Sequence, residues 1–400
     1  MQTSPQQPRP DQRMATRYRF NDPDMDLFFA AALGWGPAGG LDVGQAIHVA
    51  SQIVDGDADS WVQSFADYGD VQNTQADKWA ARGWQRAAGE ARLKAFASYR
   101  SAWQFAQPGD SFGNLYARHK AAFRAAMGEL ALPAHFFQVL FDGKPLPGVF
   151  LQNEDASAPV ALVIGGADTC FEDLFLTLGR NLFDRGYSVA LVDLPGQGIT
   201  QASGLHWMAE AERPIASVID VLIERFHAAA GRIALIGLSL GGYFVARAAG
   251  HDTRLATVIA STPFPDPAQL FALSAKAIIE HASHSEPSTA AKRARTVTLW
   301  KAGAGNVTEF LARTADMVAD PSLVTVPFLS ILGTGDSPVF AAQAREWHAR
   351  IPSARKELVE LDASTGADAH VQVNNRLRLA QECSGWMDEV FAPGRARRKA

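Results

Sequence analysis

Cysteine is scarce in this chain of 400 residues, which contains only Cys170 and Cys383. Two cysteines are too few for a disulfide framework, and neither has a second Cys or a His at the spacing of a metal-binding motif. Few thiols and no disulfide pattern are typical of a reducing compartment. We therefore predict a cytoplasmic protein that uses no metal and no other cofactor.

Long apolar runs are missing as well, and so is an excess of charge of one sign. Residues 1–19 are polar and lack the apolar stretch of a secretory signal, and no later segment is long enough to span a bilayer. The 37 Lys and Arg are interspersed with 42 Asp and Glu, for a net charge of −5. This balance argues against nucleic acid or a membrane as the partner, and we expect a small-molecule substrate.

Strand signals are absent from the first third of the chain. Residues 22–131 contain helix-compatible segments separated by Gly and Pro. We expect helices over 26–33, 44–54, 59–68, 74–105 and 114–130. An all-helical block cannot be a fragment of a parallel sheet. We therefore assign residues 1–20 to a disordered leader and residues 21–133 to a separate helical cap domain.

The periodicity changes in the remainder, 134–392. Alternating segments at 136–141 and 146–151 flank a Gly-containing turn and predict a hairpin. Apolar strands alternating with helices then predict an α/β fold with a mostly parallel sheet covered on both faces. We expect the further strands at 159–164, 187–192, 256–260, 325–332 and 356–361, besides one that begins at Ile233. Residues 267–318 are expected to contribute to a lid, and residues 393–400 to form a basic tail.

A nucleophile elbow is predicted where one of these strands ends. The apolar run from Ile233 leads into Gly237-Leu-Ser-Leu-Gly241, and a helix-compatible segment follows. A serine nucleophile in this fold lies in a strained strand-to-helix turn, which needs small neighbours. The alternative is a glycine-rich turn whose serine only caps the helix. The strand before the pentad and the helix after it favour Ser239 as a nucleophile.

A serine hydroxyl needs a base and an orienting carboxylate, and in this fold class the acid precedes the histidine along the chain. Asp336 follows the strand 325–332, at the carboxyl end where such sites lie. Its alternative role is that of a turn residue before the next helix. His348 lies within a predicted helix, whereas His370 lies in a loop after the last strand. We therefore predict Asp336 and His370 as the partners of the serine.

The oxyanion of such a reaction needs two backbone N–H donors. Leu240, directly after the serine, supplies the first. Gly166 or Ala167, in the loop after an early strand, supplies the second, although this loop also reads as a simple tight turn. Thr169 and Glu172 match a capping box that would fix the loop to its helix.

Asp168 is unexpected in this loop, because a carboxylate opposes the negative charge that develops on the oxyanion. Three explanations remain open: the side chain turns to solvent, it is held protonated, or it pairs with substrate as a proton donor. In the helical block, Tyr99, Arg100 and Trp103 are candidates for facing the substrate. The alternative for this aromatic stripe is a place in the core.

Several motifs resemble those of one known family, the 2,6-dihydroxypseudooxynicotine hydrolase and FrsA-like α/β-hydrolases with an N-terminal helical cap. The resemblance spans most of the chain. It is carried by Gly39-Gly-Leu-Asp-Val-Gly44, Asp59-Ser-Trp61, Ala97-Ser-Tyr-Arg100, Gly165-Gly-Ala-Asp168, Asp193-Leu-Pro-Gly-Gln-Gly198, Gly237-Leu-Ser-Leu-Gly241, Gly366-Ala-Asp-Ala-His370, Val371-Gln-Val-Asn374 and Trp386-Met-Asp-Glu389.

The resemblance implies a Ser239, Asp336 and His370 triad and a homodimer. It also implies an acidic residue near the substrate at Asp168, where the name-giving enzyme has Glu. The implied activity is hydrolysis of a C–C bond in an aryl or β-dicarbonyl ketone, a retro-Claisen cleavage. An esterase, lactonase or thioesterase is the alternative. A peptidase or a noncatalytic binding protein is less well supported, since no β-propeller repeat is visible and the triad is intact.

Overall fold

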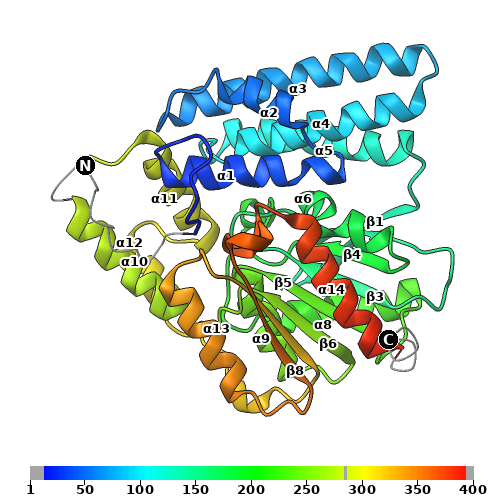
Figure 1. Ribbon diagram of the computed structural model, residues 1–400, viewed down its shortest axis with the longest axis vertical. Coiled ribbons are helices and arrows are strands. Elements are labelled where there is room, and N and C mark those ends of the chain that lie inside the picture. The colour runs from blue at the N-terminus through cyan, green and yellow to red at the C-terminus, as the bar shows by residue number, and fades with distance from the viewer. Residues whose placement is uncertain (1–12, 283–285, 393–400) are drawn as a thin grey trace.

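The computed structural model describes residues 13–282 and 286–392, and it has the predicted α/β-hydrolase fold (Figure 1). The basic tail predicted for 393–400 and the first part of the predicted leader lie outside the described residues. Among the helices of the described ranges, none is both long and apolar enough to cross a membrane.

A single eight-stranded sheet forms the centre of the molecule, with the order β1-β2-β4-β3-β5-β6-β7-β8. The first two strands pair antiparallel as the predicted hairpin, and from β4 to β8 all neighbours are parallel. The strands are β1 Ala134–Phe141, β2 Lys144–Leu151, β3 Val160–Ile164, β4 Ser188–Val192, β5 Ile233–Leu238, β6 Leu255–Ser261, β7 Phe328–Gly333 and β8 Lys356–Leu361.

Helices cover both faces of this sheet, as continuous apolar strands require. Val163 of β3 belongs to a core cluster with α14, whereas its neighbour Leu162 belongs to the cluster with α8 and α9 on the opposite face. One face carries α6 Phe171–Leu174, α7 Arg180–Phe183 and α14 Arg376–Phe391. The other carries α8 Glu212–Phe226, α9 Leu240–Ala249 and α13 Pro338–Arg350.

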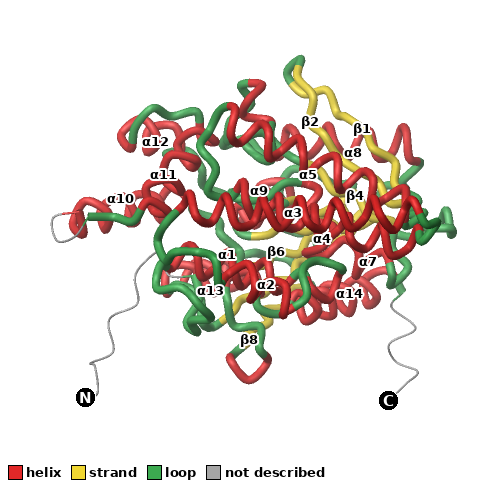
Figure 2. Tube along the Cα trace, turned by 90° about the horizontal axis from the view of Figure 1, so that it is seen from above, coloured by secondary structure: helices red, strands yellow, loops and turns green. Residues whose placement is uncertain are grey.

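A layer of five helices lies across one end of the sheet (Figures 1 and 2). It consists of α1 Pro23–Gly34, α2 Val43–Ala50, α3 Ala58–Ala81, α4 Gln85–Trp103 and α5 Asp110–Glu129. The predicted break between residues 68 and 74 is wrong, because α3 runs through it and the chain turns at Gly83, whose φ is +77°. Gly69 serves packing instead: a Cβ there would lie 2.3 Å from the Tyr99 ring.

The region predicted to contribute to a lid forms three helices between β6 and β7, namely α10 Pro267–Ala282, α11 Thr289–Ala302 and α12 Val307–Thr314. α11 packs against the helical layer (Figure 1). The Ala290 N–H donates to the Gly56 carbonyl at 3.1 Å, and Arg293 Nη1 donates to the Phe105 carbonyl at 2.8 Å. The contribution of residues 267–318 to a lid stays a prediction.

Residues 13–20 differ from the predicted disordered leader, because they are folded against the helical layer. The carboxylate of Asp26, a buried residue in α1, accepts the backbone N–H groups of Tyr18, Arg19 and Phe20 at 2.8, 2.7 and 2.8 Å. At the start of this segment the Arg13 carbonyl accepts the backbone N–H of His370 at 2.8 Å. One buried carboxylate therefore holds a segment that has no helix or strand of its own.

Replacing Asp26 by Asn should release this segment. An amide offers one acceptor oxygen, and its NH₂ group would face a backbone donor, so buried N–H groups lose their partner. We expect the free energy of unfolding in urea to fall by about 1–3 kcal/mol. The matched control is Asp67→Asn, since Asp67 is exposed and bonds only to Gln63 among the contacts described. Equal stability of the two variants would contradict the anchoring role.

Candidate active site

Ser239 lies in the turn between β5 and α9 with φ at +56°, a left-handed value that is rare for a residue other than glycine. The turn is tight on both sides. A Cβ at Gly237 would lie 2.2 Å from the Gly241 carbonyl oxygen, and one at Gly241 would lie 2.5 Å from the Gly165 oxygen. Only glycine fits at both positions, and the half-buried serine side chain therefore projects at the carboxyl end of the sheet.

The two other residues predicted for the site lie next to this serine. His370 Nε2 is 2.8 Å from Ser239 Oγ, and His370 Nδ1 is 2.6 Å from Asp336 Oδ2. The Asp336 carboxylate also accepts the Ser337 N–H at 2.8 Å and the Thr262 hydroxyl at 3.3 Å. The three side chains form one hydrogen-bonded chain, with the buried carboxylate oriented by its own neighbours.

The loop that carries His370 is held in a strained shape. Val371 and Gln372 have φ values of +45° and +51°, which side chains rarely adopt. Two buried contacts hold them: Gln372 Oε1 accepts the Ser261 hydroxyl at 2.7 Å, and Arg376 Nη1 donates to the Val371 carbonyl at 2.7 Å. The loop therefore keeps the imidazole at a fixed distance from β6.

The loop Gly165–Thr169, which we call the glycine loop, passes beside the serine. A Cβ at Gly166 would lie 2.8 Å from Ser239 Cβ. Only glycine therefore lets the backbone of this loop come so close to the serine side chain. The predicted capping box of Thr169 and Glu172 is wrong by one residue. Cys170 is the N-cap of α6 and Asp173 completes the box, because the Thr169 hydroxyl turns back to the Gly166 carbonyl at 3.1 Å.

A cleft opens between the helical layer and the carboxyl ends of the strands. Residues from both parts line it, and apolar side chains lie beside polar and charged ones. The lining residues are Arg13, Leu27, Phe28, Ala31, Trp35, Arg100, Ser101, Gln104, Gly166, Ala167, Asp168, Thr169, Asp173, Thr177, Leu238, Ser239, His370, Val371, Val373 and Arg376.

Of the three residues of α4 predicted to face the substrate, Arg100 lines the cleft and the other two do not. Tyr99 points to the far side of the layer, where its hydroxyl donates to Asp70 at 2.8 Å. Trp103 is fully buried, with its ring 3.8 Å from the Arg100 guanidinium carbon. Helical phase explains Tyr99, because successive positions are about 100° apart and Arg100 takes the side that points to the cleft. Trp103 lies on the same side of α4 as Arg100 but is covered, with its ring against the Arg100 guanidinium.

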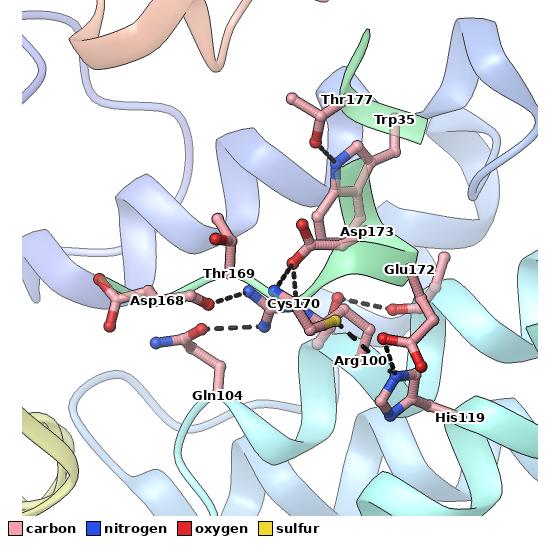
Figure 3. Close-up of polar contacts among 12 residues, drawn as sticks. Trp35, Arg100, Gln104, His119, Asp168, Thr169, Cys170, Glu172, Asp173 and Thr177 are labelled. Atoms are coloured by element: carbon pink, nitrogen blue, oxygen red, sulfur yellow. Dashed lines mark hydrogen bonds and ion pairs between the residues drawn. The ribbon is translucent and has the colours of Figure 1, made fainter. Parts of the chain in front are cut away.

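Arg100 connects the helical layer to the glycine loop (Figure 3). Its Nε donates to Asp173 Oδ2 at 2.5 Å, its Nη1 donates to Gln104 at 2.9 Å, and its Nη2 donates to the Asp168 carbonyl. Burial raises the pKa of Asp173, and the guanidinium of Arg100 opposes that shift. The ion pair is almost inaccessible, with side-chain exposures of 4% and 1%.

The side chain of Asp168 lies at the cleft and is 29% exposed, with its carboxylate 3.6 Å from the guanidinium of Arg13. Lys301 of α11, which the sequence analysis did not select, is 1% exposed, and burial lowers its pKa. Its Nζ donates to the Ala167 carbonyl at 2.7 Å. The lysine has no motif around it that would have revealed this contact.

A second buried group, beside the glycine loop, contains three side chains whose donor atoms lie close enough together to hold a metal ion (Figure 3). His119 Nε2 is 3.4 Å from Glu172 Oε2 and 3.8 Å from Cys170 Sγ. Burial and nearby carboxylates raise the pKa of the Cys170 thiol, whereas a metal ligand must be a thiolate. The protonated thiol therefore fits a buried polar cluster better than a metal centre.

Comparison with known proteins identifies a family and several related proteins. The family model described as "Serine aminopeptidase, S33" matches residues 154–364, more than half of the chain. The 20-hydroxy-prefusarin hydrolase FUS2 of Gibberella moniliformis (strain M3125 / FGSC 7600) is 31% identical over 238 residues, 55% of this chain and 56% of that protein. The alpha/beta hydrolase gkaG of Penicillium citrinum is 29% identical over 253 residues, 60% of this chain and 59% of that protein.

The chain thus covers less than two thirds of the length of these curated relatives. Among solved structures, that of 2,6-dihydroxy-pseudo-oxynicotine hydrolase has a TM-score of 0.71 at 20% identity, over 90% of this chain and 96% of that one. This likeness supports the fold, the helical layer included. Because the family model matches more than half of its length, the chain belongs to the α/β-hydrolase family described as serine aminopeptidase, S33.

Proposed function

We propose that this hydrolase cleaves a C–C bond of an aryl ketone or β-dicarbonyl compound, with Ser239 as nucleophile, His370 as base and Asp336 as orienting acid. One observation carries the C–C assignment: the carboxyl group of Asp168 lines the same cleft as the hydrogen-bonded serine. Ester hydrolysis releases an alkoxide and needs no acid for a carbon leaving group. The likeness in fold to a protein named 2,6-dihydroxy-pseudo-oxynicotine hydrolase supports the same substrate class.

The reaction begins when Ser239 Oγ adds to the ketone carbonyl while His370 Nε2 takes the hydroxyl proton. The carbonyl π electrons move to oxygen, and the resulting oxyanion is stabilised by the N–H groups of Leu240 and of Ala167 or Gly166. When the carbonyl re-forms, the adjacent C–C bond breaks and its electron pair leaves with the carbanion or enolate. An acyl-serine remains.

The leaving carbon then takes one proton, either from the imidazolium of His370 or from the acid form of Asp168. In the second case the imidazolium returns its proton to the Asp168 carboxylate, so that His370 is neutral before the next step in both cases. Water attacks the acyl-serine with His370 as base, and the products are a carboxylic acid and a protonated carbon fragment. One water is consumed in total, and Ser239, His370 and Asp168 all return to their starting protonation states. The apolar lining of the cleft, which includes Leu27 and Phe28, favours an aromatic or polyketide-like substrate.

Replacing Ser239 by Ala should abolish turnover and labelling by a fluorophosphonate probe, because the only group able to form the acyl intermediate is gone. We expect kcat to fall by a factor of about 10⁴ or more. The measurement is steady-state hydrolysis of an aryl β-diketone together with mass analysis of the labelled protein. The matched control is Ser217→Ala on α8, whose hydroxyl donates only to the Arg213 carbonyl among the contacts described. Ser261 is unsuitable as a control because its hydroxyl donates to Gln372, next to His370. Activity of Ser239→Ala within tenfold of wild type would disprove the nucleophile.

Replacing Asp168 by Asn tests the carbon acid directly. The amide keeps the shape but has no acidic proton, so cleavage of a β-diketone should fall by about 10²-fold or more while hydrolysis of the matching aryl ester changes less than about threefold. The comparison uses both substrates with one aryl group in common. Equal losses on the two substrates would assign Asp168 a structural role, and a wild type that turns over only the ester would favour an esterase.

Replacing Asp336 by Asn should leave the geometry intact but stabilise the wrong tautomer of His370. The Nδ1 atom, now facing an amide, is no longer held as a donor to a carboxylate, and Nε2 becomes a poor base. We expect kcat to fall by about 10³- to 10⁴-fold with a small change in KM. Loss of activity with unchanged thermal unfolding would support this role, whereas near wild-type kcat would contradict it.

A further inference from the structure

Three arginines line the cleft, and two of them have a carboxylate partner. The guanidinium of Arg13 lies 3.6 Å from the Asp168 carboxylate. Arg100 is paired with Asp173 at 2.5 Å, and all three of its nitrogen atoms donate hydrogen bonds. Arg376 is the third, and within the described ranges no carboxylate lies at ion-pair distance from it. Its charge therefore has no direct counter-ion there.

Arg376 is the first residue of α14 and is buried, with an exposed fraction of 7%. Its Nη1 donates to the Val371 carbonyl at 2.7 Å. Among the residues that the structure describes, neither Nε nor Nη2 has a hydrogen-bond partner, and Nε is out of contact with solvent. One edge of this guanidinium, formed by Nε and Nη2, is therefore unpaired inside the protein.

This arrangement is unfavourable for a purely structural residue. A buried charge that is not paired destabilises the folded state, and one neutral acceptor compensates for it only in part. Burial lowers the pKa of Arg376 to about 10, and Asp173, which opposes this shift, is already paired with Arg100. The guanidinium is thus still charged at neutral pH. The first turn of a helix is also the positive end of its dipole, where a cation is disfavoured. An anion in the cleft would relieve both effects.

We propose that Arg376 is a substrate-binding residue that pairs with a carboxylate group of the substrate. The two N–H groups of the unpaired edge are parallel, and this geometry matches the two oxygens of a carboxylate. Because Nε is enclosed, Nη2 is the donor that a ligand in the cleft meets first. Arg376 contacts Val371, which directly follows His370, so the carboxylate and the reacting carbonyl would share one cavity.

The inference rests on the proposed function and narrows its substrate class. The compound is an aryl ketone or β-dicarbonyl that also carries a carboxylate. The carboxylate takes no part in bond cleavage and is held by Arg376, while Ser239 acts on the ketone carbonyl.

The direct test is the binding of two ligands of the same shape, 3-phenylpropanoate and 3-phenylpropanamide, measured by titration calorimetry. We expect the wild-type protein to bind the carboxylate about 10- to 100-fold more tightly than the amide, because a hydrogen bond between two charged groups is strong in an enclosed site. Arg376→Met keeps an apolar stem and removes the charge. In this variant the preference should fall below about threefold, with little change in the affinity for the amide.

Two other variants separate charge recognition from a general loss of structure. Arg378→Met, on the same helix, is the matched control, since Arg378 is partly exposed, pairs with Glu382 and does not line the cleft. It should keep the wild-type preference. Arg376→Lys keeps a cation without the fork of N–H groups and should retain part of the preference. The end point of fluorophosphonate labelling should stay complete in all three variants.

The catalytic counterpart compares an aryl β-diketone that carries a terminal carboxylate with the primary amide of the same compound. In Arg376→Met the ratio of kcat/KM for the acid to that for the amide should fall about 10- to 100-fold, mainly through the KM of the acid. The lost contact with Val371 affects both substrates alike and cancels in this ratio.

The inference is overturned if the wild-type protein binds the two phenylpropanoyl ligands equally well, or if Arg376→Met weakens both ligands by the same factor. Calorimetric binding needs no turnover. A wild-type protein that shows the carboxylate preference but is not labelled by the fluorophosphonate would therefore overturn the proposed function alone, and the two failures are distinguishable.

Discussion

The buried ion pair between Arg100 and Asp173 is the interaction on which the arrangement of the two layers depends. Either charge alone would be strongly destabilising at these exposures of 4% and 1%, so neither residue can separate from the other without a large penalty. Arg100 belongs to a helix of the layer, and Asp173 belongs to α6, directly after the glycine loop. The pair therefore fixes the width of the cleft at the place where the loop approaches the serine.

Backbone strain occurs directly after β5 and β6 and in the loop that carries His370. Ser239, Thr262 and Val371 all have positive φ values, at +56°, +58° and +45°. Conformations of this kind cost about 1–3 kcal/mol each and persist where the surroundings determine them. Here hydrogen bonds to adjacent strands hold the backbone in these conformations. The Ser239 N–H donates to the Ser261 carbonyl at 3.1 Å, and the Thr262 N–H donates to the Ile331 carbonyl at 2.7 Å. The sheet thereby supplies the rigidity that the hydrogen-bonded Ser, His and Asp side chains require.

The fold and the juxtaposition of Ser239, Asp336 and His370 could be predicted from the sequence. Ser239 and Asp336 follow apolar strands, His370 lies in the loop after the last strand, and parallel strands bring their carboxyl ends together. The contacts of Lys301 could not, since they depend on how one helix packs and no local pattern records them. The sequence does not indicate Cys170 as the N-cap of α6, because cysteine is not a usual capping residue. In the structure the backbone N–H of Cys170 donates to the Asp173 carboxylate at 3.3 Å. In the sequence a glycine at position 69 favours the end of a helix. In the structure the helix continues, and Gly69 leaves room for the ring of Tyr99.

The hydrogen bond from the His370 N–H to the Arg13 carbonyl has a consequence for how this protein can vary during evolution. A carbonyl group is present in every residue, so position 13 can change its side chain without losing this contact. What must be kept is the path of the backbone from residue 13 to α1, which Asp26 determines. The contact with His370 therefore places no requirement on the type of residue at position 13, whereas the path of the backbone there is constrained together with the loop that carries His370.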